Sequence, residues 1–93
     1  MGILIKCENY ISDLETINDS LLSVKQKLQD ATDEIAKAKL WADEFNYAMQ
    51  LSSVYEDLHI LLDELEQEDG MRFVANKLRN KAKTFLQTVV IDV

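Results

Sequence analysis

Few residues of this 93-residue chain have the types and spacing that chemistry requires, and the most suggestive pair is Glu56 and His59. A carboxylate and an imidazole three residues apart share one face of a helix, the arrangement used in di-iron helical bundles. A complete site needs the motif on two helices and two further glutamates, so a chain with one histidine forms it only across a symmetric dimer. We expect His59 to be an ordinary solvated histidine beside Glu56 and Asp63, with no metal bound.

Cys7 is the second candidate, as a reactive thiol. It is the only cysteine, which excludes an intramolecular disulfide and a zinc site built from several cysteines. It falls on an apolar heptad position beside Tyr10, where a cysteine usually acts as a small buried hydrophobe. The sequence contains no Ser/His/Asp set, phosphate-binding glycine loop or metal-ligand cluster. We therefore predict a protein that is not an enzyme and has no catalytic residues, cofactor or metal.

The charge and the apolar content of the chain limit the kinds of partner that it is expected to bind. Seventeen acidic residues against ten basic ones give a net charge of -7, which disfavours binding to nucleic acid. No apolar run approaches the roughly 20 residues that cross a bilayer, and the first ten residues lack the long apolar core of a secretory leader. The chain is expected to be a single domain over residues 1–93, located in the cytoplasm, with export that needs no cleaved leader as the alternative.

Long helices are expected because proline is absent, only two glycines occur and 47% of the residues are apolar. The first segment has an apolar heptad seam of the coiled-coil type, with spacings that alternate between three and four. Capping signals at Asn9 and at Ser12 with Glu15 predict a helix that starts between residues 8 and 13 and runs from about 8 to 40. The seam consists of Cys7, Tyr10, Leu14, Ile17, Leu21, Val24, Leu28, Ala31, Ile35 and Ala38.

A second apolar stripe follows Trp41 on a different phase of the heptad. The change of phase predicts a reversal or sharp kink near residues 40–45 and a second helix over about 43–68. Trp41 is then either a large core anchor or the marker of the turn. Val54 and Leu61 widen this stripe, which indicates a central helix or an interface. Its members are Phe45, Ala48, Leu51, Tyr55, Leu58, Leu62 and Leu65.

Gly70 occupies the place of a left-handed helix cap, and Asp69 is able to cap the segment that follows. A third helix is expected over about 71–89, either separate from the second or continuing it after a kink. The apolar ends at residues 3–5 and 89–91 are expected to be frayed or docked tails rather than a pair of strands. The predicted fold is all-α, an antiparallel helical hairpin or a three-helix unit.

Charge is segregated along the chain. Residues 43–69 hold nine acids and no lysine or arginine, whereas residues 71–88 hold five basic residues and no acid. The simple interpretation is that these are solvated helix faces. Alternatively, the basic segment lies across an acidic surface of its own second helix or of a neighbour. Acids at the end of the second helix also oppose its dipole, so a flexible junction is expected there. The predicted charged rim comprises Glu64, Glu66, Glu68, Lys77, Arg79, Lys81 and Lys83.

The order of these segments resembles a known family. A short apolar piece at residues 3–5, a long amphipathic helix, a tryptophan at position 41 and a second amphipathic helix are similar to the WXG-type helical hairpins of type VII secretion and the small helical partners of LXG toxins. The resemblance covers most of the chain and implies a bacterial protein that pairs with another helical hairpin, as a toxin's targeting partner or chaperone. The chain has Trp41-Ala42-Asp43 where the family has Trp-x-Gly, and it lacks the Tyr-x-x-x-Asp/Glu export signal.

The predicted function is a protein–protein interaction module that forms a homo- or hetero-oligomer with a helical partner. One alternative is an acidic phage or mobile-element inhibitor whose residues 43–69 fill a basic groove of a host enzyme. Another is a self-assembling coiled coil built on the first seam. The broad stripe from Leu51 to Leu65 is the expected main working surface. The residues expected to contact a partner are Leu14, Ile17, Leu21, Val24, Leu28, Trp41, Phe45, Leu51, Tyr55, Leu58, Leu62 and Leu65.

Overall fold

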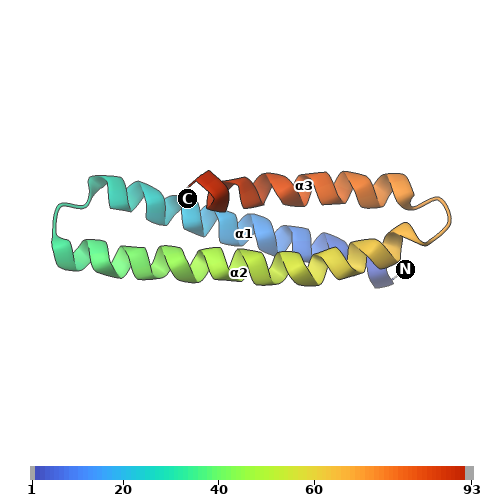
Figure 1. Ribbon diagram of the computed structural model, residues 1–93, viewed down its shortest axis with the longest axis horizontal. Coiled ribbons are helices and arrows are strands. Elements are labelled where there is room, and N and C mark those ends of the chain that lie inside the picture. Colours follow the sequence, from blue (N-terminus) through green and yellow to red (C-terminus); the bar gives the residue numbers. More distant parts are fainter. Residues whose placement is uncertain (1, 92–93) are drawn as a thin grey trace.

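Three long helices form an elongated unit, which confirms the all-α prediction. The computed structural model describes residues 2–91 and the side chains of residues 2–86. The helices are α1 (Gly2–Asp30), α2 (Glu34–Glu66) and α3 (Arg72–Ile91), and each runs antiparallel to the one before it (Figure 1). The extents are 55 × 19 × 16 Å and the radius of gyration is 15.7 Å. A compact domain of this length has a radius of gyration of about 12 Å, so the molecule is a rod.

Helix α1 begins at Gly2, several residues before the predicted start. Ile3 and Leu4 pack against the core, and this burial holds the first turns in a helical conformation despite the β-branched side chain. The predicted caps at Asn9 and Ser12 are wrong, since both residues lie inside the helix. The carbonyl of Ser12 accepts a hydrogen bond from the hydroxyl of Thr16, at 3.1 Å.

The first reversal occurs at residues 31–33, so the prediction of a break near residues 40–45 is wrong. Asp33 caps α2, because its carboxylate accepts a hydrogen bond of 3.0 Å from the backbone N–H of Ala36. Ile35 and Ala38 keep the heptad spacing of the first seam, but they lie beyond the reversal and are exposed. Trp41 lies within α2 and does not mark a turn.

The second reversal separates α2 from α3, so the two are distinct antiparallel helices. Helix α2 ends at Glu66, and the N–H of Gln67 donates to the last-turn carbonyls of Glu64 and Leu65. Gly70 has a φ of 77°, the left-handed conformation that its position predicted, although it lies in the loop and not directly after the helix. The loop of residues 67–71 follows the acid-rich end of α2, and the flexibility expected of this junction stays a prediction.

The core is built from one face of each helix. Small residues on α3 allow that helix to approach the other two closely. The buried hydrophobic residues are Cys7, Ile11, Leu14, Leu21 and Val24 on α1, Leu51, Leu58, Leu62 and Leu65 on α2, and Ala75 and Ala82 on α3.

Helix α3 covers only part of the α1–α2 pair. Helix α2 has 33 residues and α3 has 20, which correspond to lengths of about 50 and 30 Å. In Figure 1 the far end of α3 lies partway along the other two helices, while the loop of residues 31–33 lies well beyond it. About 20 Å of the α1–α2 pair thus projects past the described end of α3.

Candidate protein-interaction surface

The first half of α2 is apolar on both of its faces. The inner face carries the half-buried Leu40 and Tyr47, and Tyr47 packs against the core. The outer face exposes Ile35, Phe45 and Met49, and Trp41 is exposed beside it; the exposed fractions are 69%, 64%, 57% and 55%. In the single chain, only one side of this half of α2 packs against another part of the protein.

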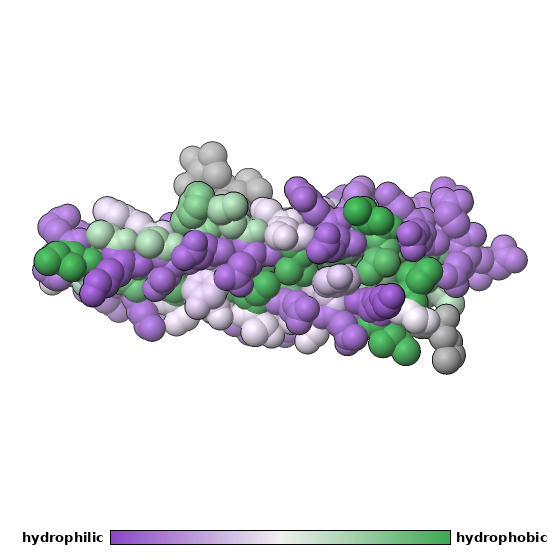
Figure 2. Space-filling model, turned by 90° about the horizontal axis from the view of Figure 1, so that it is seen from below, coloured by the Kyte–Doolittle hydropathy of each residue, from purple (hydrophilic) through white to green (hydrophobic). Residues whose placement is uncertain are grey.

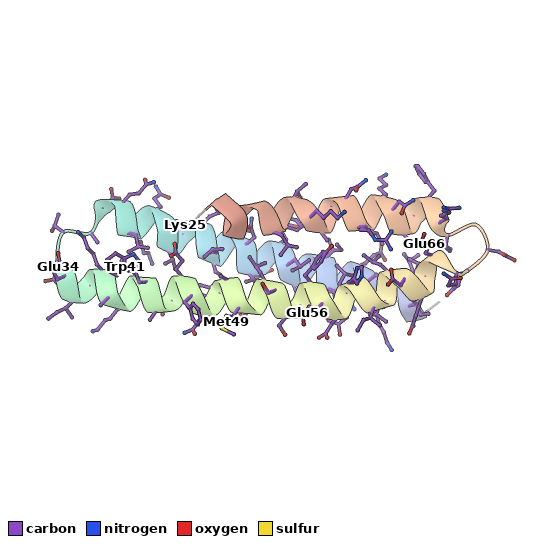
Figure 3. All side chains as sticks on the ribbon, in the orientation of Figure 1. Lys25, Glu34, Trp41, Met49, Glu56 and Glu66 are labelled. Atoms are coloured by element: carbon purple, nitrogen blue, oxygen red, sulfur yellow. The ribbon has the colours of Figure 1, made fainter. Side chains whose placement is uncertain are left out.

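Six residues of the outer face repeat at spacings of three and four, and we call them the outer stripe. All six are exposed, and none has a charged side chain. The stripe extends over about 26 Å of helix, and its heptad spacing is typical of a seam between two helices. Figure 3 shows Met49 projecting from the side of α2 that faces away from α3. The outer stripe consists of Ile35, Ala38, Ala42, Phe45, Met49 and Ser52.

Beside the outer stripe, the surface on which α3 docks continues past the end of α3. The Arg79 guanidinium contacts Asp63 at 3.1 Å and Glu66 at 3.0 Å, which fixes the side of α2 that faces α3. Phe45 precedes Asp63 by about five helical turns, and Trp41 precedes Glu66 by about seven. Whole turns return a residue to the same side, so Trp41 faces the direction that α3 occupies further along. Phe45, in line with the more exposed Asp63, lies at the edge of the outer stripe nearest to that side.

Helix α1 also has one large exposed apolar residue on the side where α3 packs further along the rod. Ile11 and Leu78 line a common hollow between α1 and α3. Leu22 follows Ile11 by about three turns and is 47% exposed. The projecting end of the α1–α2 pair therefore presents apolar side chains where α3 is missing.

The outer face of α2 is also hollowed. A shallow depression of about 390 Å³ adjoins the outer stripe, and its walls are mostly apolar. Figure 2 views the molecule from the side on which α2 lies and shows hydrophobic atoms interleaved with hydrophilic ones along the rod. A depression of this kind accepts a side chain from a partner helix. Its walls are formed by Phe45, Ala48, Met49, Ser52, Ser53 and Glu56.

Of the chemical candidates, Glu56 borders the depression beside the outer stripe, His59 lies one turn further along α2, and Cys7 lies in the core. The His59 ring stacks on Tyr55 with the centroids 6.2 Å apart, and its Nε2 lies 3.6 Å from an Asp63 oxygen. The side chain of His59 is half exposed, as expected of a solvated histidine. Cys7 is fully buried, which confirms its predicted place in the core. Among the described side chains, no three of the His, Cys, Asp and Glu type gather where they would hold a metal ion.

The residues predicted to contact a partner fall into three groups. Ile17, Leu28 and Tyr55 are half-buried, and Trp41 and Phe45 are exposed. The others fill the core of the chain, so a partner does not reach them while the helices stay packed. These buried residues are Leu14, Leu21, Val24, Leu51, Leu58, Leu62 and Leu65.

The sequence interpretation missed part of the outer stripe. Ala42, Met49 and Ser52 were not singled out, while Ile35 and Ala38 were assigned to the first helix. A signal was present, because the heptad of the first seam continues through these positions without a change of phase. The seam thus combines two surfaces, an internal one on α1 and an external one on α2.

The charged rim is partly paired within the chain. Arg79, with a side chain 17% exposed, donates to Asp63 and Glu66 of α2 and to Asn76 of its own helix. The basic third helix thus lies across acidic residues of its own second helix, one of the two arrangements expected. Arg72 lies 3.9 Å from the other Glu66 oxygen. The remaining rim residues, Glu64, Glu68, Lys77, Lys81 and Lys83, are exposed.

Comparison with known proteins does not assign a family. No protein-family model, curated protein or solved structure matches the chain. The structure shows a small all-helical protein of three long packed helices. No helix in its described part has the length and apolar character needed to cross a membrane.

Proposed function

We propose that this chain is a protein-binding module whose contact surface is the outer stripe together with Trp41. One observation supports the proposal above the others: four large apolar side chains are more than half exposed on one half of a helix whose opposite face is already packed. Contiguous exposed apolar surface marks interaction sites, and aromatic side chains dominate binding energy in such surfaces. The proposed activity is binding, with no chemical step.

Site-specific photo-crosslinking in the native cells tests the proposal. A photoreactive residue at position 45 is expected to form a discrete protein adduct. The matched control replaces Phe73, which is 76% exposed on α3 and lies outside the outer stripe. Adducts that are no more abundant from position 45 than from position 73 would contradict the proposal.

Trp41 provides a second measurement on purified material, because it is the only tryptophan in the chain. Burial of its half-exposed ring by a partner is expected to shift its fluorescence to shorter wavelength. Met49→Glu places a charge in the surface without touching the core, so it is expected to abolish the shift and leave helicity intact.

Two narrower identities of the partner rest on the sequence. In the first, the chain pairs with a helical hairpin of a type VII-secreted toxin as its targeting chaperone, although the reversal at residues 31–33 removes the turn at Trp41 from that resemblance. In the second, the acidic part of α2 occupies a basic groove of a host enzyme. Replacing the exposed Glu64 and Glu68 by lysine is expected to abolish binding only in the second case.

A further inference from the structure

We infer that the outer stripe binds a second copy of this chain, with the two α2 helices antiparallel about a two-fold axis between residues 43 and 44. The inference rests on the proposed binding function and names its partner. In a two-fold interface the same surface serves both copies, so the stripe has to be complementary to itself.

The side-chain sizes along the outer stripe make the stripe complementary to itself. An antiparallel two-fold pairing places each stripe residue opposite the stripe residue that lies equally far on the other side of the axis. A large residue then meets a small one in every layer, which lets side chains interlock without gaps or crowding. The three facing pairs are Ile35 with Ser52, Ala38 with Met49, and Ala42 with Phe45.

A parallel pairing lacks this fit. It sets Phe45 against Phe45 and Ala42 against Ala42, so crowded layers alternate with empty ones. The size pattern of the stripe thus favours the antiparallel arrangement over the parallel one.

The residues beside the stripe agree with the same register. Residues that flank the stripe on one side meet the same flank of the second copy, so Trp41 lies nearest Ala48 of the second copy, again a large residue against a small one. On the opposite flank Lys39 lies near Asn46 of the second copy, so like charges do not meet. Because the six stripe residues are uncharged, their burial removes no charged side chain from water.

The distribution of charge also favours antiparallel helices. Seven acids lie on the C-terminal half of α2 and the loop after it, between residues 56 and 69. Antiparallel pairing sends these two acidic segments to opposite ends of the dimer, whereas parallel pairing brings them side by side. Each chain carries a net charge of -7, so this separation lowers the repulsion between copies.

Complementary charge variants in the full chain test both the partner and the register. Ala38→Lys and Met49→Glu each place a charge opposite an apolar residue, and each is expected to weaken the dimer by about tenfold or more. The double variant sets Lys opposite Glu at two places in the antiparallel dimer and is expected to recover most of that loss. Within one chain the two positions are about 16 Å apart along α2, too far to pair with each other. Sedimentation equilibrium over a wide range of concentration gives the dissociation constants.

Ile60→Glu is the matched control, since Ile60 is 59% exposed on the same helix beyond the stripe. It is expected to dimerise as the wild type does. A wild-type chain with the mass of a monomer at the highest concentration would overturn the inference, as would single variants that dimerise normally. Single and double variants that are equally monomeric would overturn the antiparallel register.

The two proposals fail separately. A purified chain that stays monomeric but crosslinks from position 45 to a different protein retains the binding function and loses the second copy as partner. A chain that does neither loses both.

Discussion

At the scale of single residues, Cys7 shows how the core controls a reactive group. Burial raises the pKa of the Cys7 thiol, and the negative charges of Glu64 and Glu8 raise it further. A thiolate is the nucleophilic form of cysteine, so this thiol is poorly placed for chemistry in the folded protein.

The raised pKa of Cys7 predicts a pH dependence of stability. Because the thiol binds its proton more tightly when folded, its contribution to the free energy of unfolding is complete below the ordinary thiol pKa of about 8.5. That contribution is lost as the pH rises through the higher folded-state pKa. Cys7→Ala removes it, so the stability difference between wild type and variant is expected to shrink as the pH rises from about 8.5 to the folded-state pKa. Urea unfolding at a series of pH values measures this difference, and one that stays constant into the alkaline range would contradict the prediction.

Arg79 is the residue through which α3 is held electrostatically to α2. Its side chain is largely buried and contacts Asp63 and Glu66. Arg79→Ala is expected to lower the free energy of unfolding by about 1 kcal/mol, at the upper end for a partly exposed ion pair. The control is Arg72→Ala, because Arg72 is 82% exposed and only 3.9 Å from Glu66. Equal losses in the two variants, measured by urea unfolding, would show that burial of Arg79 adds nothing.

At the scale of elements, the capping residue Asp33 decides where the chain reverses. Asp33→Ala removes the acceptor for the Ala36 N–H and is expected to cost about 1 kcal/mol. Asp30→Ala is the matched control, since Asp30 is the last residue of α1, where a negative charge opposes the helix dipole. Thermal unfolding is expected to show a loss for the first variant and little change or a small gain for the second. A loss of the same size in both would indicate that the loop needs acidic residues in general.

Three helices and the left-handed Gly70 were predictable from the sequence, because periodicity and the lack of breakers specify helices locally. The first boundary was not, since Ile35 and Ala38 happen to preserve the heptad across the reversal. A cap such as Asp33 gives a local signal of about 1 kcal/mol, which is easily overlooked beside a ten-member stripe. Local sequence patterns also do not show which of the two apolar faces of α2 packs against the other helices of the same chain.

At the scale of the whole molecule, the packing of the three helices decides which apolar stripe forms the core and which stays exposed for binding. The first seam and the broad leucine stripe were both plausible partner surfaces from the sequence. The structure uses most of each to hold its own three helices together, and Trp41 and Phe45 are the predicted contact residues that stay exposed. The outer stripe is free because it points away from α3, whereas Trp41 is exposed because the described part of α3 ends before it reaches the first half of α2.

The shape of the proposed dimer follows from the position of the outer stripe in the first half of α2. With the axis between residues 43 and 44, each α2 overlaps the other only over residues 34–53, and the remaining residues of each extend past the other's end. The paired α2 helices then span about 20 Å more than one of them alone.

Small-angle X-ray scattering at a concentration that gives the dimer is therefore expected to show a rod longer than one chain by about that amount. A monomeric chain, such as the Met49→Glu variant, is expected to keep the 55 Å length and the radius of gyration of about 15.7 Å. A dimer in which the helices align along their full length would be thicker but no longer than the monomer. A dimer of unchanged length would contradict the partial overlap that the outer stripe requires.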